Sequence, residues 1–171
     1  MKKLLVMDSP IGKLTLIEEN KELICLDFGE TIIKDIPREE TAFLKEVKNQ
    51  LAEYFEGRRQ SFDVKLNPKG TEFQKKVWTN LLTIPYGETA SYKKIAILSG
   101  NEKASRAVGM ANNRNPIPII IPCHRVVGST GKMVGYGGGL EIKEYLLELE
   151  KKYKQKHYNK TLDYSVIKPS L

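Results

Sequence analysis

Three prolines within seven residues restrict the fold of this chain more than any other feature of its sequence. Pro116, Pro118 and Pro122 lie in the apolar segment 115–122, which leads directly into Cys123. A proline lacks the backbone N–H that a helix would use, and it also restricts the residue before it. The segment therefore cannot form a helix, and we expect a stiff, extended approach that holds Cys123 in one place.

The length and composition favour a folded protein that needs neither a membrane nor disulfides. A chain of 171 residues fits one domain, or one domain with a small appendage, and a hydrophobic fraction of 40% can build its core. The basic N-terminus reaches Asp8 and Pro10 too soon for a signal peptide, and the apolar runs fall short of the ~18–20 residues that span a bilayer. Cys25 and Cys123 are too few for a disulfide scaffold. We therefore expect a cytoplasmic protein with no membrane partner.

The net charge of +7 lies wholly in the second half of the chain. Residues 1–80 hold 14 basic and 14 acidic side chains, whereas residues 81–171 hold 14 basic and 7 acidic ones. Within the second half, residues 91–132 carry a net charge of +6. This asymmetry suggests an anionic partner such as nucleic acid, but a solvated lysine-rich face would have the same composition. The charge alone does not decide between the two.

Residues 1–66 are expected to form a small antiparallel sheet with one helix. Short apolar runs are separated by turn sequences and lie at 4–7, 14–17 and 23–28. A helix is expected to begin near Pro37, and its apolar positions recur at spacings of three and four until Gly57 ends it. This N-terminal unit shows no catalytic grouping.

Residues 67–150 are expected to be mainly helical. Two helices, over 92–98 and about 102–112, are separated by a few residues that include Gly100, which is the outline of a helix-turn-helix. The second helix is rich in small residues, which would allow a close approach to a groove. An ordinary corner between two helices in a core would have the same outline.

A basic C-terminal tail, 151–171, is expected after a last helix that begins near Leu140. The tail holds six lysines and one aspartate, a net charge of +5. It is either a disordered electrostatic arm or a strand or helix packed on the body.

Cys123 is the candidate reactive group. A lone cysteine is most often a small buried hydrophobe, but His124 and Arg125 adjoin this one, and positive neighbours favour the thiolate. In an extended backbone the side chains of Cys123 and His124 point to opposite faces, so we expect a bridging water rather than direct pairing. No oxyanion-hole motif accompanies the cysteine in the sequence. Transfer of an alkyl group to the thiolate is therefore favoured over hydrolysis.

The heptad 121–127, Ile-Pro-Cys-His-Arg-Val-Val, resembles the active-site signature of the O6-alkylguanine-DNA alkyltransferases, the methylated-DNA–protein-cysteine methyltransferases. The resemblance is strong over about 68–150, and residues 1–66 are similar only in layout. Other matching positions are Pro85-Tyr86-Gly87-Glu88, Ser91-Tyr92, Ser105 to Gly109, Asn115-Pro116, Gly135-Tyr136, Gly138-Gly139-Leu140, Lys143 and Glu150. The resemblance implies an α+β fold, in which an antiparallel sheet and helix of ribonuclease H-like layout precede a mostly helical domain with a helix-turn-helix.

The resemblance also implies a DNA repair activity. The alkyl group of O6-methylguanine in duplex DNA would pass irreversibly to Cys123, once per protein molecule. His124 would activate the thiol through a water, and Glu150 would orient the imidazole. Asn115 would fix the turn beneath these residues. Tyr92 would donate a proton toward N3 of the leaving guanine.

The same resemblance assigns residues to the DNA and the flipped base. Val126 and Tyr136 would line the base pocket, with Gly137 and Lys143 near O6. Arg106 would enter the duplex and fill the gap left by the flipped nucleotide, on a helix docked in the minor groove. The remaining expected DNA contacts are Ser91, Lys103, Ala104 and Ser105, with phosphate contacts also from Lys93, Lys94 and Arg114.

Each assigned residue also has a purely structural interpretation. Tyr92 and Tyr136 could be ordinary core tyrosines, and Arg106 one more exposed arginine. Glu150 could be a solvated charge at a helix end. Residues 112–114 are more polar than the family pattern and could alter the DNA contacts.

No metal and no other cofactor is expected. Some relatives bind zinc through N-terminal Cys and His residues, but Cys25 is the only such residue before Cys123 here. The expected partner is double-stranded DNA containing O6-alkylguanine, and the expected state is a monomer. One alternative is a protein without transfer chemistry, either one that binds alkylated DNA or a helix-turn-helix regulator. The other alternative is a thiol hydrolase or redox protein.

Overall fold

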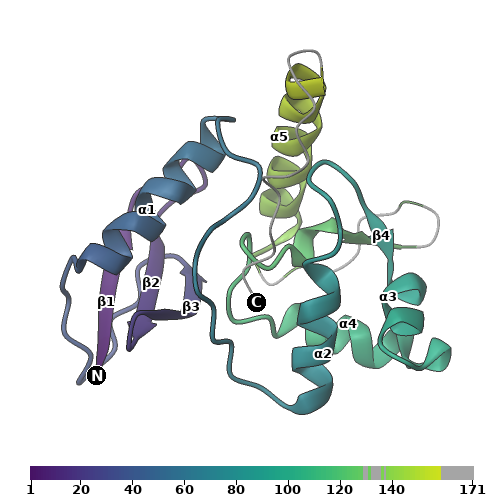
Figure 1. Ribbon diagram of the computed structural model, residues 1–171, viewed down its shortest axis with the longest axis horizontal. Coiled ribbons are helices and arrows are strands. Elements are labelled where there is room, and N and C mark those ends of the chain that lie inside the picture. Colours follow the sequence, from purple (N-terminus) through teal and green to yellow (C-terminus); the bar gives the residue numbers. More distant parts are fainter. Residues whose placement is uncertain (129–130, 132–135, 137, 159–171) are drawn as a thin grey trace.

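The computed structural model describes residues 1–128, 131, 136 and 138–158, and its two halves lie side by side (Figure 1). A small antiparallel sheet with a helix packed on it forms the N-terminal half, and helices make up most of the C-terminal half. Residues 56–71 run between the halves and join them. This arrangement confirms the α+β class expected from the sequence.

The N-terminal sheet consists of β1 (Lys2–Met7), β2 (Leu14–Glu19) and β3 (Glu22–Phe28), antiparallel and in that spatial order. The central strand β2 is the most buried of them, because it has a neighbouring strand on each edge and its Leu14 and Leu16 side chains belong to the core. Asn20 and Lys21 both adopt positive φ and make the tight turn between β2 and β3.

α1 (Ala42–Phe55) packs on this sheet. The sequence predicted that its first turn would be at Pro37, but the helix begins later, at Ala42. The residues that follow Pro37 lie beside β1 instead, and the Leu4 N–H donates to the Pro37 carbonyl at 3.0 Å. The open edge of β1 needs backbone partners, and this segment supplies them. The helix then begins after Thr41, whose side chain accepts a backbone N–H of the first turn.

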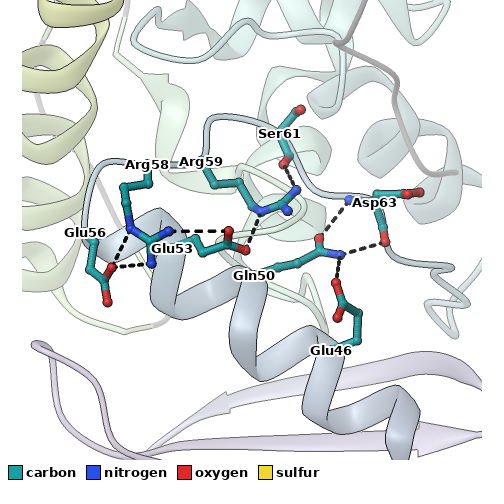
Figure 2. Close-up of polar contacts among 8 residues, drawn as sticks. All are labelled: Glu46, Gln50, Glu53, Glu56, Arg58, Arg59, Ser61 and Asp63. Carbon is teal, nitrogen blue, oxygen red and sulfur yellow. Dashed lines mark hydrogen bonds and ion pairs between the residues drawn. The ribbon is translucent and has the colours of Figure 1, made fainter.

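Gly57 ends α1 as expected, and polar side chains hold the following loop against the helix (Figure 2). The Gln50 amide donates to the Asp63 carbonyl at 3.1 Å and accepts from the Asp63 N–H at 2.9 Å. The Arg59 guanidinium donates to Glu53 at 3.3 Å. These contacts fix the C-terminal turns of α1 in relation to the loop that leads to the second half.

The C-terminal half consists of short elements around the proline-rich segment. They are α2 (Glu72–Leu81), β4 (Ala90–Ser91), α3 (Tyr92–Leu98), a 3-10 turn (Glu102–Ala104), α4 (Ser105–Asn113), a second 3-10 turn (Cys123–Arg125), β5 (Val126–Val127) and α5 (Leu140–Tyr158). β4 and β5 pair in parallel, which brings Ser91 beside Val127. The buried Trp78 indole donates to the Ala111 carbonyl at 2.9 Å and fixes α2 to α4.

α5 extends into the segment for which the sequence predicted a separate tail from Lys151. The helix continues to Tyr158, and two side chains beyond Lys151 have partners on the body: Tyr153 packs against the core, and Lys154 pairs with Glu88 at 3.3 Å. The rest of the expected tail, 159–171, lies outside the described residues. Within the described residues, no helix has both the length and the apolar character to cross a membrane.

Replacing Gly57 with alanine is expected to destabilise the protein by about 3 kcal/mol. Gly57 has a φ of +76°, and a Cβ there would overlap the ring of Tyr153 on α5. The left-handed backbone alone costs about 1–2 kcal/mol for a residue with a Cβ, and the clash adds to it. Thermal or denaturant unfolding measures the loss.

Gly12→Ala is the matched control for this substitution. Gly12 also has a positive φ, +103°, but a Cβ there would meet nothing within 4 Å. Its loss of stability should therefore be limited to the backbone contribution. Equal losses in the two variants would contradict the proposed contact between Gly57 and α5.

Candidate active site

The segment before Cys123 is a compact turn rather than the extended approach predicted from its prolines. The Ile121 N–H donates to the Ile117 carbonyl at 3.0 Å, and the Cys123 N–H donates to the Ile121 carbonyl at 2.8 Å. Ile119 has a φ of 74°, a strained conformation for a β-branched residue. Prolines exclude a regular helix but not tight turns, and the missing backbone hydrogen bonds are replaced here by side chains.

Two asparagines supply those hydrogen bonds. The Asn115 amide donates to the Ile121 carbonyl at 2.8 Å, and its oxygen accepts from the Ile117 N–H at 2.9 Å. Asn112 is buried, and its amide donates to the Cys123 carbonyl at 3.2 Å. Asn112 therefore holds the backbone of the turn in place. Its position in a polar run of the sequence did not indicate this role.

Burial raises the pKa of the Cys123 thiol to about 11. Hydrogen bonding from Asn115 and Tyr136 and the positive charge of Lys143 act in the opposite direction but do not outweigh burial. The sequence predicted that the adjacent Arg125 would favour the thiolate. The cation that acts on the sulfur is instead Lys143, from α5. Cys123 is thus a protonated thiol at neutral pH and needs a base to become a nucleophile.

The candidate base is His124, which directly follows Cys123 in the chain and forms a buried pair with Glu150. The His124 Nε2 atom is 2.7 Å from the Glu150 Oε2 atom, and both side chains are almost wholly buried. Arg125 holds the same carboxylate with two guanidinium nitrogens, at 2.8 Å and 3.0 Å. The alternative of a solvated helix-end charge is therefore wrong for Glu150.

The pKa values of both partners in this pair are lowered, but for different reasons. Burial acts to raise the pKa of Glu150, but the facing His124 and Arg125 groups outweigh it and hold that pKa well below its usual range. Burial lowers the pKa of His124 despite the attraction of Glu150. A neutral His124 donates through Nε2 to the carboxylate, so its Nδ1 atom is an acceptor. That Nδ1 atom is buried and has no hydrogen-bond partner among the described residues.

Two further groups on Glu150 were not predicted from the sequence. The Tyr54 hydroxyl of α1 donates to the Oε2 atom at 2.6 Å, and the Gly87 N–H donates to the Oε1 atom at 3.3 Å. Tyr54 occupies an apolar position of an amphipathic helix, where it reads as an ordinary core residue. No signal in one sequence distinguishes it from its neighbours.

Three further residues of the expected site, Tyr92, Tyr136 and Lys143, lie near the same thiol. Burial, together with the nearby Cys123, raises the pKa of both Tyr92 and Tyr136, so each keeps its phenolic proton. Tyr136 also packs against Phe28 of β3, with ring centroids 5.9 Å apart. Lys143 is buried, and its ammonium donates to the Val126 carbonyl at 2.7 Å. Gly137 lies outside the described residues.

Comparison with known proteins places this arrangement in a family. The model for the ribonuclease-like domain of 6-O-methylguanine DNA methyltransferase matches residues 3–68, and the model for the DNA binding domain of the same protein matches residues 72–152. The chain belongs to the 6-O-methylguanine DNA methyltransferase family.

Individual methyltransferases are similar over most of their length. A methylated-DNA–protein-cysteine methyltransferase of Methanosarcina barkeri is 55% identical over 150 residues, which cover 85% of this chain and 94% of that protein. The constitutive enzyme of Bacillus subtilis is 45% identical over 159 residues, 87% of this chain and 96% of that protein. The crystal structure of Mycobacterium tuberculosis OGT in complex with DNA has a TM-score of 0.83 and 48% identity, covering 88% of this chain and 94% of that one.

The residues that the methyltransferase resemblance assigns to DNA lie mainly on α3, α4 and the 3-10 turn between them. Arg106 and Lys103 are exposed, while Ala104 and Ser105 are half-buried. Ser91 caps α3, because its hydroxyl accepts from the Lys94 N–H at 3.0 Å. The helix predicted over 102–112 is interrupted, since its first turn is the 3-10 turn and α4 begins at Ser105.

Two of the charges expected to face a polyanion do not do so freely. Arg125 is buried in the Glu150 network and also donates to the Ile84 carbonyl at 2.7 Å. The exposed Lys93 lies 3.4 Å from Glu102. The positive face of this methyltransferase is therefore smaller than the sequence count suggests. The described residues contain no group of three His, Cys, Asp or Glu side chains that could hold a metal ion.

The free energy of unfolding of the methyltransferase is expected to fall as the pH drops below about 6.5. His124 has a lowered pKa in the folded state, so the unfolded chain, with a histidine pKa of about 6.5, binds the proton first. Stability is then lost between this pH and the lower folded pKa, by up to about 1.4 kcal/mol per pH unit. Urea unfolding at pH 7, 6 and 5 measures the slope. A His124→Gln variant lacks the group and should show a flatter profile, and parallel profiles would contradict this origin.

Proposed function

We propose that this chain repairs O6-alkylguanine in double-stranded DNA by transferring the alkyl group to its own Cys123, once per molecule. The observation that carries the proposal is the buried pair of His124 and Glu150, whose histidine directly follows the buried Cys123 in a chain that belongs to the methyltransferase family. All the groups that the reaction needs come from one chain, so we expect the protein to act as a monomer.

The first step is activation of the thiol. With a pKa of about 11, Cys123 holds its proton at neutral pH until a base removes it. His124 is neutral, its Nδ1 atom can accept that proton through a water, and Glu150 then stabilises the imidazolium that forms. Lys143 and Asn115 favour the thiolate while it exists.

The second step is the displacement. The Cys123 sulfur attacks the alkyl carbon, so that an S–C bond forms as the C–O6 bond breaks. The electron pair of the broken bond stays on the guanine, and Tyr92 donates a proton toward N3 so that neutral guanine leaves. The raised pKa of Tyr92 keeps that proton available. Because the thioether is inert to ordinary nucleophiles, the protein cannot turn over.

The base must leave the duplex before either step can occur. An alkylated guanine in the stack is out of reach of a buried thiol, and rotating it outward costs a few kcal/mol. We expect α3 and α4 to act as a helix-turn-helix in the minor groove, with the exposed Arg106 filling the gap. Phosphate contacts from Lys94, Lys103 and Arg114 would supply most of the affinity without reading the sequence.

Intact-mass measurement tests the proposed reaction. The protein is incubated with a duplex that contains one O6-methylguanine, weighed intact, and then digested for peptide mapping. We expect one added methyl group, on Cys123, which saturates at one equivalent of DNA. Continued turnover or a label on Cys25 would contradict the proposal, and tight binding without a change of mass would favour a lesion-binding protein.

Tyr92→Phe is expected to slow the transfer by about 100-fold with little change in DNA affinity. The phenylalanine keeps the packing of the ring, which lies against Gly109 of α4, but it cannot donate the proton. Loss of a general acid typically reduces a rate by 10²–10⁴-fold. Single-turnover kinetics and fluorescence anisotropy measure the two effects. Tyr145→Phe, at an exposed position on α5, is the control, and an equal slowing there would refute the role of Tyr92.

A further inference from the structure

A tyrosine of the N-terminal half reaches into the acceptor site. The Tyr54 hydroxyl lies 2.6 Å from the Glu150 Oε2 atom, the same oxygen that is 2.7 Å from His124 Nε2. The Tyr54 side chain is completely buried. The N-terminal half, which shows no catalytic grouping in its sequence, therefore contributes one polar group to the centre of the site.

Tyr54 is held in place on every side. Its ring packs against Phe55, Phe62 and Tyr86, with ring centroids 5.4, 5.5 and 6.2 Å apart. The polar contacts of Gln50 with Asp63 fix the loop beyond α1, as Figure 2 shows. A hydroxyl on so rigid a support has a fixed direction, and rigid support is what lets a residue set the geometry of its partner.

We propose that Tyr54 is a positioning residue of the acceptor site, which holds the Glu150 carboxylate and so sets the proton affinity of His124. This inference rests on the proposed transfer to Cys123, because only there does the proton affinity of His124 matter. The hydrogen bond of the Tyr54 hydroxyl goes to Glu150. Tyr54 acts through Glu150, and it links the N-terminal half to the reactivity of Cys123.

The direction of the effect follows from the shared oxygen. A hydrogen bond from Tyr54 draws charge from Glu150 Oε2, which leaves less negative potential for the His124 ring. Removing the hydroxyl returns that potential, so the imidazolium becomes easier to form and the pKa of His124 rises. A protonated His124 cannot accept the Cys123 proton. The acid limb of the transfer reaction should therefore move to higher pH.

Other charged and titratable groups face the same pair and remain in place when Tyr54 is changed. His124 is faced by Glu150 and Lys143 of α5 and by Arg125 of its own turn. Glu150 also faces Tyr86 and Tyr136. Burial and the negative charge of Glu150 raise the pKa of Tyr54 well above its ordinary value, so it stays a donor at every pH of interest.

Tyr54→Phe, with Tyr86→Phe as its control, tests the proposal. Tyr86 lies in the same aromatic cluster, but its buried hydroxyl has no hydrogen-bond partner among the residues that the structure describes. Single-turnover transfer rates from pH 5 to 9 are measured for both variants. In parallel, ¹⁵N-histidine NMR follows the titration directly, since the chain contains only His124 and His157.

In Tyr54→Phe we expect the His124 titration and the acid limb of the rate both to rise by about one pH unit. The rate at neutral pH should fall about 10-fold, as for other groups that support a catalytic residue. Tyr86→Phe should leave the transfer rate within 2-fold of that of the parent protein and the His124 titration unchanged. A slower rate with an unchanged His124 titration would mean that Tyr54 is only structural, and it would overturn the proposal, as would no change at all.

A second variant keeps the test decisive if Tyr54→Phe does not fold. Tyr54→3-fluorotyrosine keeps the hydroxyl and makes it a stronger donor, so the His124 titration should move to lower pH. A shift to higher pH or no shift would also overturn the inference. The NMR titration needs no DNA, so it reports on Tyr54 even if the protein gains no methyl group, which is the separate failure of the proposed function.

Discussion

Replacing Cys123 with serine is expected to abolish alkyl transfer completely while leaving DNA binding in place. A hydroxyl holds its proton far more tightly than a thiol and is the weaker nucleophile toward carbon, so the His124–Glu150 pair cannot activate it enough. The serine side chain is nearly isosteric with cysteine, and Cys123 is buried whereas Arg106, the residue expected to enter the duplex, is exposed. Intact mass should show no added methyl group, and anisotropy should show a DNA affinity within about 3-fold of the parent protein.

Cys25→Ser is the matched control for this loss. Burial and the neighbouring Asp27 raise the pKa of Cys25 to about 12, so this thiol is the poorer nucleophile. Its replacement should leave the transfer of one methyl group intact. A methyl group on the Cys123→Ser variant, or a loss of transfer in Cys25→Ser, would show that another residue is the acceptor.

The acceptor turn shows what a single sequence can and cannot predict. The prolines and Cys123 mark the place of the site, because restrictions on the backbone act locally and can be read from the chain. The shape of the turn could not be read in the same way. It depends on the side chains of Asn112 and Asn115, which replace the missing backbone hydrogen bonds.

The electrostatics of the site were harder to predict than its place. Neighbours in the chain are not neighbours in space: Arg125 adjoins Cys123 in sequence but faces Glu150, whereas Lys143 of α5 acts on the thiol. The prediction that Arg125 would favour the Cys123 thiolate was therefore wrong about which cation acts on the sulfur. Tyr54 was missed for the same reason, since its partner lies 96 residues away along the chain.

The charge asymmetry of the chain likewise does not show which charges are exposed. The net charge of +6 over residues 91–132 counts Arg125, which is buried, and Lys132, which lies outside the described residues. Arg106, Lys103 and Arg114 remain exposed around α4. A count of charges in the sequence adds together two kinds of residue: buried ones that stabilise the site and exposed ones that face solvent. The two kinds can be told apart only when the burial of each side chain is known.

Glu150→Gln is expected to destabilise the fold by about 3–5 kcal/mol and to reduce alkyl transfer severely. The carboxylate is the only acid among the described residues that contacts the buried Arg125 and His124, and breaking a buried pair by removing one partner leaves an uncompensated charge. The low pKa of Glu150 means that its contribution is complete above pH 4 to 5, and that it is lost as the pH falls through the folded pKa. The difference between parent and variant should therefore be large at pH 7 and shrink in acid.

Denaturant unfolding measures this loss, and Glu148→Gln is its control. Glu148 is exposed on the same helix, so its replacement should change stability by less than about 0.5 kcal/mol. Adding Arg125→Met to Glu150→Gln removes the orphaned cation and should restore part of the stability, though not the transfer, because His124 still lacks its carboxylate. Recovery of both would mean that Glu150 serves the fold alone. Recovery of neither would mean that the buried arginine is not what makes the loss of Glu150 so costly.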